Sequence, residues 1–366
     1  MLDLIHLIDV RIGPMLVGQI AQTPQRKIVF EYSPDFLKAG YSISPFYLPL
    51  KPGLFAAPDE PFAGNFGVFN DSLPDGWGNL LLDRFLMSQG ISLSSLSVLD
   101  RLSLIGSNGM GALQYFPDQK IQSDFDASEL AFLAREVRKV ISETEYSEHI
   151  EMLIGAGGSP GGARPKALIK DNDESWMVKF PSSLDPPNIG SIEFEYSRIA
   201  RKCGIEMPET QLFENKYFGV KRFDREGDTR IHMHTASGLL NASHRYPSLD
   251  YTDLMQASFA LTKNITDSYK LFRQMVFNVL TGIKDDHAKN FSFLYLENGW
   301  RVAPAYDLAP SGGFNGNHTT TVAGQGQPSK SDIFEVGTQA GLKQSHLLQI
   351  FDEVYENCSA IRQRQW

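Results

Sequence analysis

The chain has 366 residues, 42% of them hydrophobic, so it can bury a substantial core. Its net charge of −9 argues against a protein that grips nucleic acid directly, because such proteins usually carry a basic excess. The two cysteines, Cys203 and Cys358, form no metal or disulfide pattern, and no apolar run reaches the ~18 residues that span a bilayer. We therefore expect a soluble, cytoplasmic protein without membrane contact, which would reach DNA only through a partner.

The first part of the chain, residues 1–118, is predicted to be rich in β-structure. Val17–Ala21 and Lys27–Tyr32 are short apolar or β-branched runs that predict two strands. Asn79–Met87 has the apolar spacing of a helix, and a glycine-containing loop follows at Gly106–Gly111. The polar run 117–126 marks a domain boundary.

A second part is predicted at residues 119–225, and a mainly helical third part at residues 226–366. In the second part, two helices are expected before a glycine-rich loop that starts at Gly155, and strands and one further helix are expected after it. The third part should be helical from Asp250 to about Gly282. The predicted elements of the second part are helices Ser128–Ser142, Glu145–Ile154 and Glu193–Cys203, and strands Ala167–Lys170, Trp176–Phe180, Glu209–Glu214 and Tyr217–Phe223.

The glycine-rich loop runs from Gly155 to Lys166, just before the first two of these strands. Glycine tolerates positive φ and brings backbone N–H groups close to a ligand, so such a loop can cradle phosphates. A flexible linker is the alternative interpretation. The two cations at its end, Arg164 and Lys166, favour the phosphate site.

Lys179 lies inside an apolar strand and must place its ammonium in a polar pocket or beside an acid. Thirteen residues separate it from Lys166, enough for a hairpin that returns Lys179 beneath the glycine-rich loop. A kinase strand lysine meets the nucleotide phosphates in this way. The alternative is a lysine that points outward from an edge strand.

Asp285 and Asn290 lie five residues apart in the segment that follows an apolar helix. This is the spacing of a kinase catalytic loop, in which the aspartate accepts the substrate hydroxyl proton and the asparagine holds magnesium. A polar capped turn is the structural alternative. Asp307 follows Asn290 by 17 residues, across one predicted hairpin, where a kinase places its second metal ligand. Together these residues predict phosphoryl transfer.

These segments resemble the HipA family of bacterial serine/threonine kinase toxins, and the likeness covers nearly the whole chain. Further segments that resemble the family are Phe69–Gly78, Leu104–Leu113, Val220–Arg225 and Arg230–Tyr251. The resemblance implies an α+β fold, two-lobed and protein-kinase-like. The β-rich N-terminal subdomain would pack on the small lobe, and the C-terminal lobe would be mainly helical.

The resemblance also implies a set of site residues for ATP and Mg²⁺. Asp285 would be the catalytic base, and Asn290 and Asp307 would bind the metal. The residues implied to contact the nucleotide are Ala163, Arg164, Pro165, Lys166, Ala167 and Leu168 in the loop, Lys179, the hinge Lys221, Arg222 and Phe223, and His287, Lys289, Asn290, Tyr306 and Asp307. Ser159 stands where some members of the family are autophosphorylated.

The partners that the resemblance implies are a helix-turn-helix antitoxin of the HipB kind and a protein substrate with a serine or threonine acceptor. The substrate could be a translation component. Two alternatives stay open. One is a catalytically silent, kinase-like co-regulator that acts with a DNA-binding antitoxin, and the other is a kinase for small molecules. The complete set of Lys179, Asp285, Asn290 and Asp307 argues against a silent protein.

Overall fold

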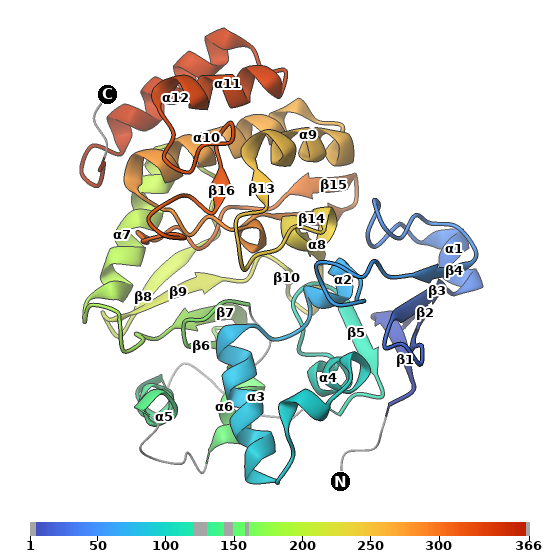
Figure 1. Cartoon of the computed structure of the whole chain (residues 1–366). Coiled ribbons are helices and arrows are strands. Elements are labelled where there is room, and N and C mark those ends of the chain that lie inside the picture. The colour runs from blue at the N-terminus through green and yellow to red at the C-terminus, as the bar shows by residue number, and fades with distance from the viewer. Residues whose placement is uncertain (1–4, 120–129, 143–148, 158–160, 364–366) are drawn as a thin grey trace. The chain divides into compact units, whose positions relative to one another are not determined.

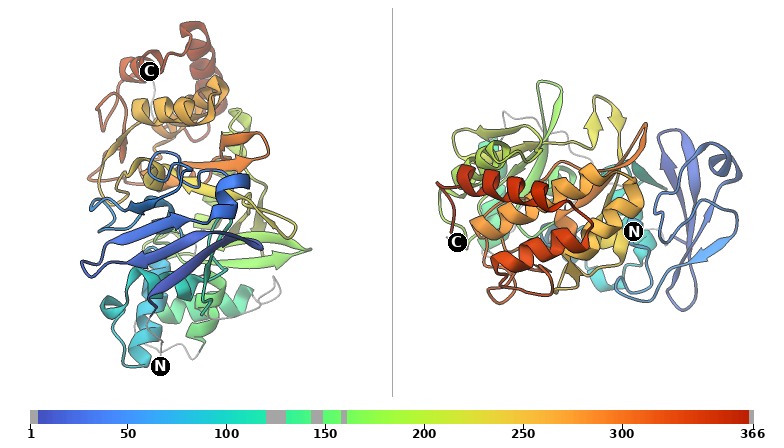
Figure 2. Two further views of the ribbon diagram at one scale, coloured as in Figure 1. Left: turned by 90° about the vertical axis from the view of Figure 1, so that its right-hand side faces the viewer. Right: turned by 90° about the horizontal axis from the view of Figure 1, so that it is seen from above.

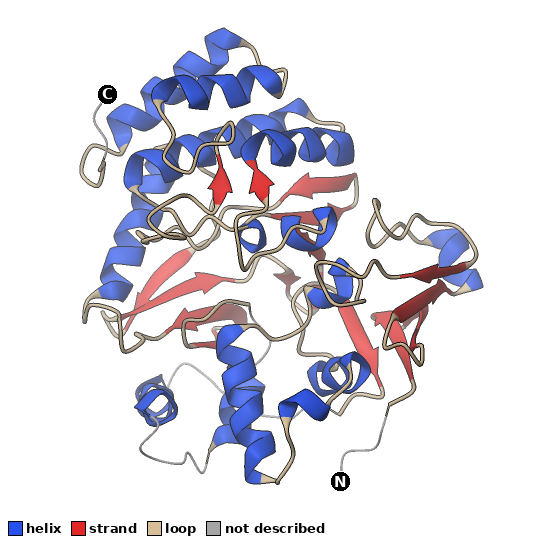
Figure 3. Cartoon of the chain, viewed as in Figure 1, coloured by secondary structure: helices blue, strands red, loops and turns tan. Residues whose placement is uncertain are grey.

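The computed structural model describes residues 5–119, 130–142, 149–157 and 161–363 of the chain. The chain divides into two compact units. Unit 1 comprises Met1–Gly190 and Gln211–Met233, and unit 2 comprises Ser191–Thr210 and His234–Trp366. Most of the strands belong to unit 1 and the longest helix belongs to unit 2 (Figure 1, Figure 3). This mixture confirms the expected α+β class, whereas the division of the sequence into three parts stays a prediction.

Unit 1 begins with a five-stranded antiparallel sheet of order β4-β3-β2-β1-β5, which Figure 2 shows in blue with β5 in cyan. On β3, Ile28, Phe30 and Tyr32 alternate and are all buried, as expected where one face of a strand covers a core. The strands predicted at 17–21 and 27–32 are confirmed as β2 and β3. The strands are β1 (Leu7–Ile12), β2 (Met15–Gln22), β3 (Ile28–Tyr32), β4 (Leu54–Ala56) and β5 (Leu113–Phe116).

Short helices follow between β3 and β5. The helix predicted at 79–87 is confirmed as α3, which begins three residues earlier, at Gly76. α4 was not predicted; a capping box formed by Ser97 and Asp100 starts it, and Gly106 at φ +52° ends it. These elements are α1 (Pro34–Ala39), α2 (Gly67–Asn70), α3 (Gly76–Ser88), η1 (Leu93–Ser95) and α4 (Val98–Ile105).

A second sheet in unit 1 has the order β6-β7-β9-β8 and is accompanied by two helices. Its strands match the four predicted ones to within a few residues. α6 includes Gly155–Gly157, so the glycine-rich loop begins later than expected, and residues 128–129 and 145–148 of the predicted helices lie outside the described residues. The elements are α5 (Leu130–Ser142), α6 (Ile150–Gly157), β6 (Lys166–Asp171), β7 (Glu174–Lys179), β8 (Thr210–Phe213) and β9 (Tyr217–Lys221).

Unit 2 is built on helices around a core in which Phe272, Met275, Phe277 and Phe351 are buried. Helices α9 to α12, orange to red in Figure 2, lie side by side, and α9 and α10 confirm the helical prediction for 250–282. No described helix is both long and apolar enough to cross a membrane. The helices are α7 (Ile189–Lys202), α8 (Ala236–Leu240), α9 (Tyr251–Thr262), α10 (Ile265–Thr281), α11 (Lys330–Gln339) and α12 (Gln344–Asn357).

Small sheets complete the chain. β14 and β15 form the antiparallel hairpin that was predicted between Asn290 and Asp307, and β12 extends it to three strands. β13 and β16 form a short parallel pair, and β10 and β11 form a hairpin in unit 1. The strands are β10 (Arg225–Glu226), β11 (Thr229–Arg230), β12 (His232–Thr235), β13 (Leu249–Asp250), β14 (Ser292–Leu296), β15 (Gly299–Val302) and β16 (Thr320–Thr321).

Candidate active site

The loop between α10 and β14 carries the predicted catalytic residues of unit 2. α10 ends at Gly282, whose φ of +72° is a left-handed conformation that glycine adopts without strain. Asn290 Nδ2 donates a 2.7 Å hydrogen bond to the Asp285 carbonyl oxygen, and the Asp285 amide donates one of 2.8 Å to Ser311 Oγ. The loop therefore fixes Asn290 against Asp285, while the Asp285 side chain stays exposed.

Asp286, which the sequence did not single out, lies beneath this loop with only 1% of its surface exposed. Its Oδ2 accepts hydrogen bonds of 2.8 Å from the Tyr251 hydroxyl and from His318 Nδ1. Its Oδ1 accepts hydrogen bonds of 2.9 and 3.2 Å from the amides of Thr319 and Thr320. Burial and the Asp286 carboxylate raise the pKa of Tyr251 well above its usual value. Asp286 is thus the buried anchor of the loop, whereas its neighbour Asp285 is exposed.

Replacing Asp286 by alanine should destabilise unit 2 by at least about 2 kcal/mol, because several buried donors would lose their acceptor. Asp352→Ala is the control, since it removes an exposed carboxylate of α12 and should change stability by about 0.5 kcal/mol or less. Urea denaturation of both variants measures the difference. Equal losses of stability in the two variants would show that Asp286 is not the anchor.

Asp307 follows the β14–β15 hairpin and adopts φ +57°, a conformation that residues other than glycine rarely adopt and that recurs at functional sites. The residue before it, Tyr306, connects this segment to the catalytic loop. Its hydroxyl donates a 2.6 Å hydrogen bond to the Lys289 carbonyl oxygen and lies 2.5 Å from Ser292 Oγ. Unit 2 therefore brings the 285–290 loop and the segment that carries Asp307 together.

The donor set that was predicted for Mg²⁺ consists of Asn290 and Asp307. Because Asn290 Nδ2 is occupied by the Asp285 carbonyl, the amide oxygen Oδ1 is the atom that remains for a metal. Magnesium prefers oxygen ligands and usually takes only one or two protein side chains, with waters and phosphate oxygens completing its shell. Among the described residues no cluster of three His, Cys, Asp or Glu side chains could hold a metal ion. Asn290 and Asp307 nevertheless offer two oxygen ligands, which suits a Mg²⁺ ion that also binds the phosphates of a nucleotide.

In unit 1, Lys166 and Lys179 form a directly opposed pair on β6 and β7. Directly opposed residues of an antiparallel pair project from the same face of the sheet. The two lysines are 5% and 6% exposed, and the Lys179 ammonium lies 5.7 Å from the centre of the Phe218 ring. The hairpin that was predicted to bring Lys179 to the end of the glycine-rich loop is therefore present.

The described part of the glycine-rich loop packs on the start of α3. The Trp77 amide donates a 3.1 Å hydrogen bond to the Gly162 carbonyl oxygen, and a Cβ at Gly76 would come within 2.9 Å of Ala163 Cα. Lys166 Nζ donates to the Gly161 carbonyl oxygen. Arg164 forms a 3.0 Å ion pair with Asp185, so its guanidinium is directed to a carboxylate of the same unit. Ser159 lies outside the described residues.

The predicted site residues thus fall into two groups. Unit 1 holds the group predicted to contact the nucleotide from the small lobe, and all its members lie on or beside the second sheet. Unit 2 holds the predicted catalytic and metal-binding group. The first group is Ala163, Arg164, Pro165, Lys166, Ala167, Leu168, Lys179, Lys221, Arg222 and Phe223, and the second is Asp285, His287, Lys289, Asn290, Tyr306 and Asp307.

Comparison with protein families gives two matches that together span most of the chain. Residues 8–116 match the HipA N-terminal domain, and residues 158–361 match the HipA-like C-terminal domain. The second match alone covers more than half of the sequence. The chain belongs to the HipA family.

Individual relatives are distant. A protein of Sinorhizobium fredii named "Putative kinase Y4dM" is 28% identical over 152 residues, which are 37% of each chain, so this chain spans little more than a third of that relative. The serine/threonine-protein kinase toxin HipA of Shewanella oneidensis is 23% identical over 340 residues, 83% of this chain and 73% of the toxin. The solved complex of HipA, HipB and operator DNA from the same organism contains a chain with a TM-score of 0.73 at 19% identity. The match covers 97% of this chain and 89% of that one, which shows a shared, HipA-like fold.

Two segments that suggested the HipA family in the sequence contact each other in unit 1, although more than a hundred residues separate them. The Gly111 amide donates a 2.7 Å hydrogen bond to Asp224 Oδ2. Arg225 donates to the Gly109 and Gly111 carbonyl oxygens at 2.9 and 3.0 Å, and Arg230 donates to the same two oxygens at 2.8 and 3.1 Å. The chain segment just after the predicted hinge is thus tied to the 106–111 loop of the N-terminal domain.

Asp224 is the charge at the centre of this contact. Burial opposes its ionisation, but Arg222 at 2.7 Å, then Arg225 at 2.8 Å, outweigh burial and hold the pKa of the Asp224 carboxyl well below its usual range. Burial, and then the neighbouring Arg222, lowers the pKa of Arg225 to about 9 and that of Arg230 to about 10. All these side chains are therefore charged at neutral pH, and the carboxylate compensates a concentrated positive cluster.

Proposed function

We propose that this HipA-family chain is an ATP- and Mg²⁺-dependent protein serine/threonine kinase, the toxin component of a toxin–antitoxin pair. The observation that carries the proposal is the loop in which Asn290 is hydrogen-bonded to the Asp285 backbone, with Tyr306 connecting that loop to the segment of Asp307. The names of the two distant relatives support the same class of reaction.

In the proposed reaction the Asp285 carboxylate accepts the proton of a serine or threonine hydroxyl. The hydroxyl oxygen forms a bond to the γ-phosphorus of ATP, the bond from that phosphorus to the β,γ-bridging oxygen breaks, and ADP leaves. Mg²⁺ held by Asn290 and Asp307 would neutralise phosphate charge. Lys166 and Lys179 would attract the other phosphate oxygens, and residues 221–223 would meet the adenine. Positioning and electrostatic stabilisation supply most of the rate in such reactions.

Incubation with γ-labelled ATP and Mg²⁺, followed by phosphoamino-acid analysis of the protein fraction, tests this proposal. Label in phosphoserine or phosphothreonine is the expected result. Label found only in small alcohols, when these are supplied as acceptors, would favour a small-molecule kinase instead. A chain that binds no nucleotide and transfers no label would be a silent co-regulator.

The proposed partner is a helix-turn-helix antitoxin of the HipB kind, because a chain of the Shewanella complex of HipA, HipB and operator DNA shares the fold. With a net charge of −9, this chain should bind operator DNA only through that partner. A gel-shift of operator DNA by the chain alone would contradict this assignment. A translation component in the cytoplasm is the target class that we infer from the family.

Ser159 is proposed as a site of autophosphorylation in the glycine-rich loop. A phosphate there would oppose the charge of ATP and change the conformation of the loop. Phosphopeptide mapping after prolonged incubation with Mg²⁺ and ATP should find Ser159 modified, and Ser159→Ala should remove that phosphopeptide. An unmodified Ser159 under these conditions, in a preparation that phosphorylates other proteins, would exclude the switch but not the kinase.

A further inference from the structure

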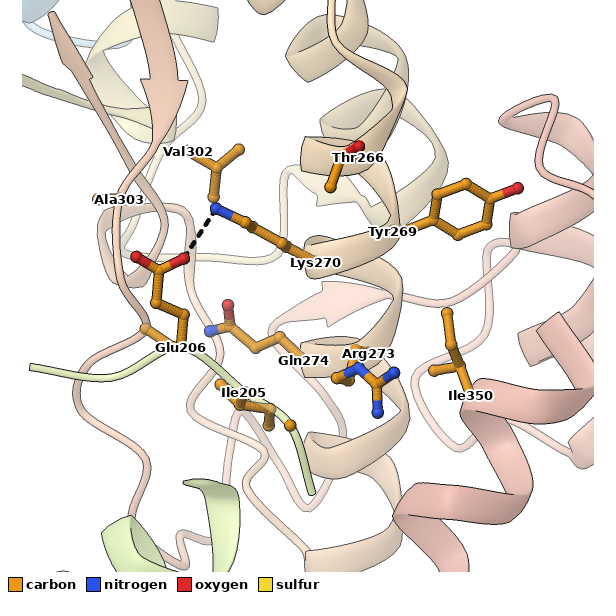
Figure 4. Close-up of a pocket in the computed structure, with 12 residues that line it drawn as sticks. Ile205, Glu206, Thr266, Tyr269, Lys270, Arg273, Gln274, Val302, Ala303 and Ile350 are labelled. Carbon is orange, nitrogen blue, oxygen red and sulfur yellow. Dashed lines mark ion pairs between the residues drawn. The ribbon is translucent and has the colours of Figure 1, made fainter. Parts of the chain in front are cut away.

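Unit 2 contains a cavity of about 260 Å³, and none of the predicted catalytic residues lines it (Figure 4). It is bounded by α10, by the loop after α7, by α12 and by the chain that leaves β15. Its apolar walls include Ile205, Val302 and Ile350, each less than 9% exposed. Such walls suit a compact apolar group.

The charges around the cavity are already matched. Lys270 forms an ion pair of 2.8 Å with Glu206, which Figure 4 shows across the cavity. Arg273 forms one of 2.8 Å with Glu353 and also donates a 2.8 Å hydrogen bond to the Cys203 carbonyl oxygen. A charged ligand would have to break one of these pairs, whereas a neutral ligand would not.

Gln274 is an uncharged polar side chain that lines the cavity. It is 6% exposed, and Figure 4 shows its amide directed into the cavity. The amide is therefore available to hydrogen-bond whatever occupies the cavity, water or a ligand. A carboxamide offers the complementary donor and acceptor in one plane and would pair with both atoms.

We propose that this cavity binds a small neutral molecule that carries a carboxamide on an apolar body. The apolar body would contact Ile205, Val302 and Ile350, and the carboxamide would pair with Gln274. The proposal does not depend on phosphoryl transfer, because no residue assigned to that reaction lines the cavity.

Three probes of one size distinguish this proposal from its alternatives: benzamide, benzoate and benzylammonium, each titrated into the full chain by ligand-observed NMR. Benzamide should bind with a Kd about tenfold lower than either ion, the ratio that one additional neutral hydrogen bond supports. Equal binding of all three would overturn the carboxamide assignment. Binding of none of them would show that water fills the cavity, and would also overturn it.

Gln274→Leu keeps the volume of the side chain and removes its amide. The variant should bind benzamide about tenfold more weakly than the wild type. Gln256→Leu, at an exposed position of α9, is the matched control and should bind benzamide unchanged. Ala303→Leu, which narrows the cavity by a different route, should weaken binding of benzamide even if Gln274→Leu does not fold. Unchanged benzamide binding in Gln274→Leu or in Ala303→Leu would place the probe elsewhere on the chain and overturn the proposal.

Discussion

Asp285→Ala should lower the rate of phosphoryl transfer by roughly 10²–10⁴-fold, the usual contribution of a general base. The expected cause is local. The loop keeps Asn290 against the Asp285 backbone carbonyl, so removal of the carboxylate should leave this predicted metal ligand in place. The affinity for ATP should therefore change little, and the loss should fall on the rate constant of the chemical step.

Release of ADP measured at saturating ATP and Mg²⁺, beside calorimetric titration of the nucleotide, separates these two quantities. Asp352→Ala, at an exposed position of α12, is the matched control and should retain the full rate. A variant Asp285→Ala that keeps its rate would show that Asp285 is not the base. A variant that loses nucleotide binding as well would show that the carboxylate acts in binding.

Asp224→Ala should lower the free energy of unfolding by about 3–5 kcal/mol, the usual effect of removing one partner of a buried ion pair. Arg222 and Arg225 would keep their charges with no carboxylate between them, and the Gly111 amide would lose its acceptor. Asp228→Ala is the control, because Asp228 lies only four residues away in the exposed turn between β10 and β11. Urea denaturation compares the two variants, and equal stability would contradict the structural account of this contact.

The same contact predicts a dependence on pH. The pKa of Asp224 is lower in the folded chain than its unfolded value of about 3.9, so its contribution to stability is complete above that value. The contribution falls as the pH drops from about 4 toward the folded pKa. The difference in stability between the wild type and Asp224→Ala should therefore be constant near neutrality and shrink in acid. A stability difference between the two proteins that grows below pH ~4 would contradict a lowered pKa of Asp224 in the folded chain.

Local patterns predicted two structural features of the candidate site. The spacing of Asp285 and Asn290 selected one of two adjacent aspartates, and the structure places that one at the surface of the loop. The thirteen residues from Lys166 to Lys179 predicted a hairpin, and the two lysines pair directly on β6 and β7. In each case the signal lies within one short segment, so no knowledge of the rest of the fold was needed.

Other features depend on residues that are remote in the sequence. Nothing near Asp286 indicates that Tyr251, Thr319 and Thr320 will donate to its carboxylate. Similarly, the contact of Asp224 with Gly111 is not visible in either segment alone. Burial of a carboxylate is decided by tertiary packing, which a local pattern does not record.

Two of the helices that were not predicted carry a signal in the local sequence. α4 and α11 each begin with a capping box, Ser97 with Asp100 and Ser329 with Asp332, and that signal is readable in the sequence. The glycine-rich loop was the opposite case. Gly155–Gly157 suggest a loop by composition, yet they form the last turn of α6. Gly157 is required there because a Cβ would come within 2.0 Å of the Lys166 carbonyl oxygen, so close packing and not flexibility explains this glycine.

The intact mass of the purified chain, before and after incubation with Mg²⁺ and ATP, tests the proposed phosphoryl transfer most directly when Asp285→Ala is measured beside it. We expect the wild type to gain one or more phosphates and the variant to gain none. A gain of equal size in both proteins, or no gain in the wild type even when a protein acceptor of serine and threonine is supplied and its own mass is followed, would contradict the account.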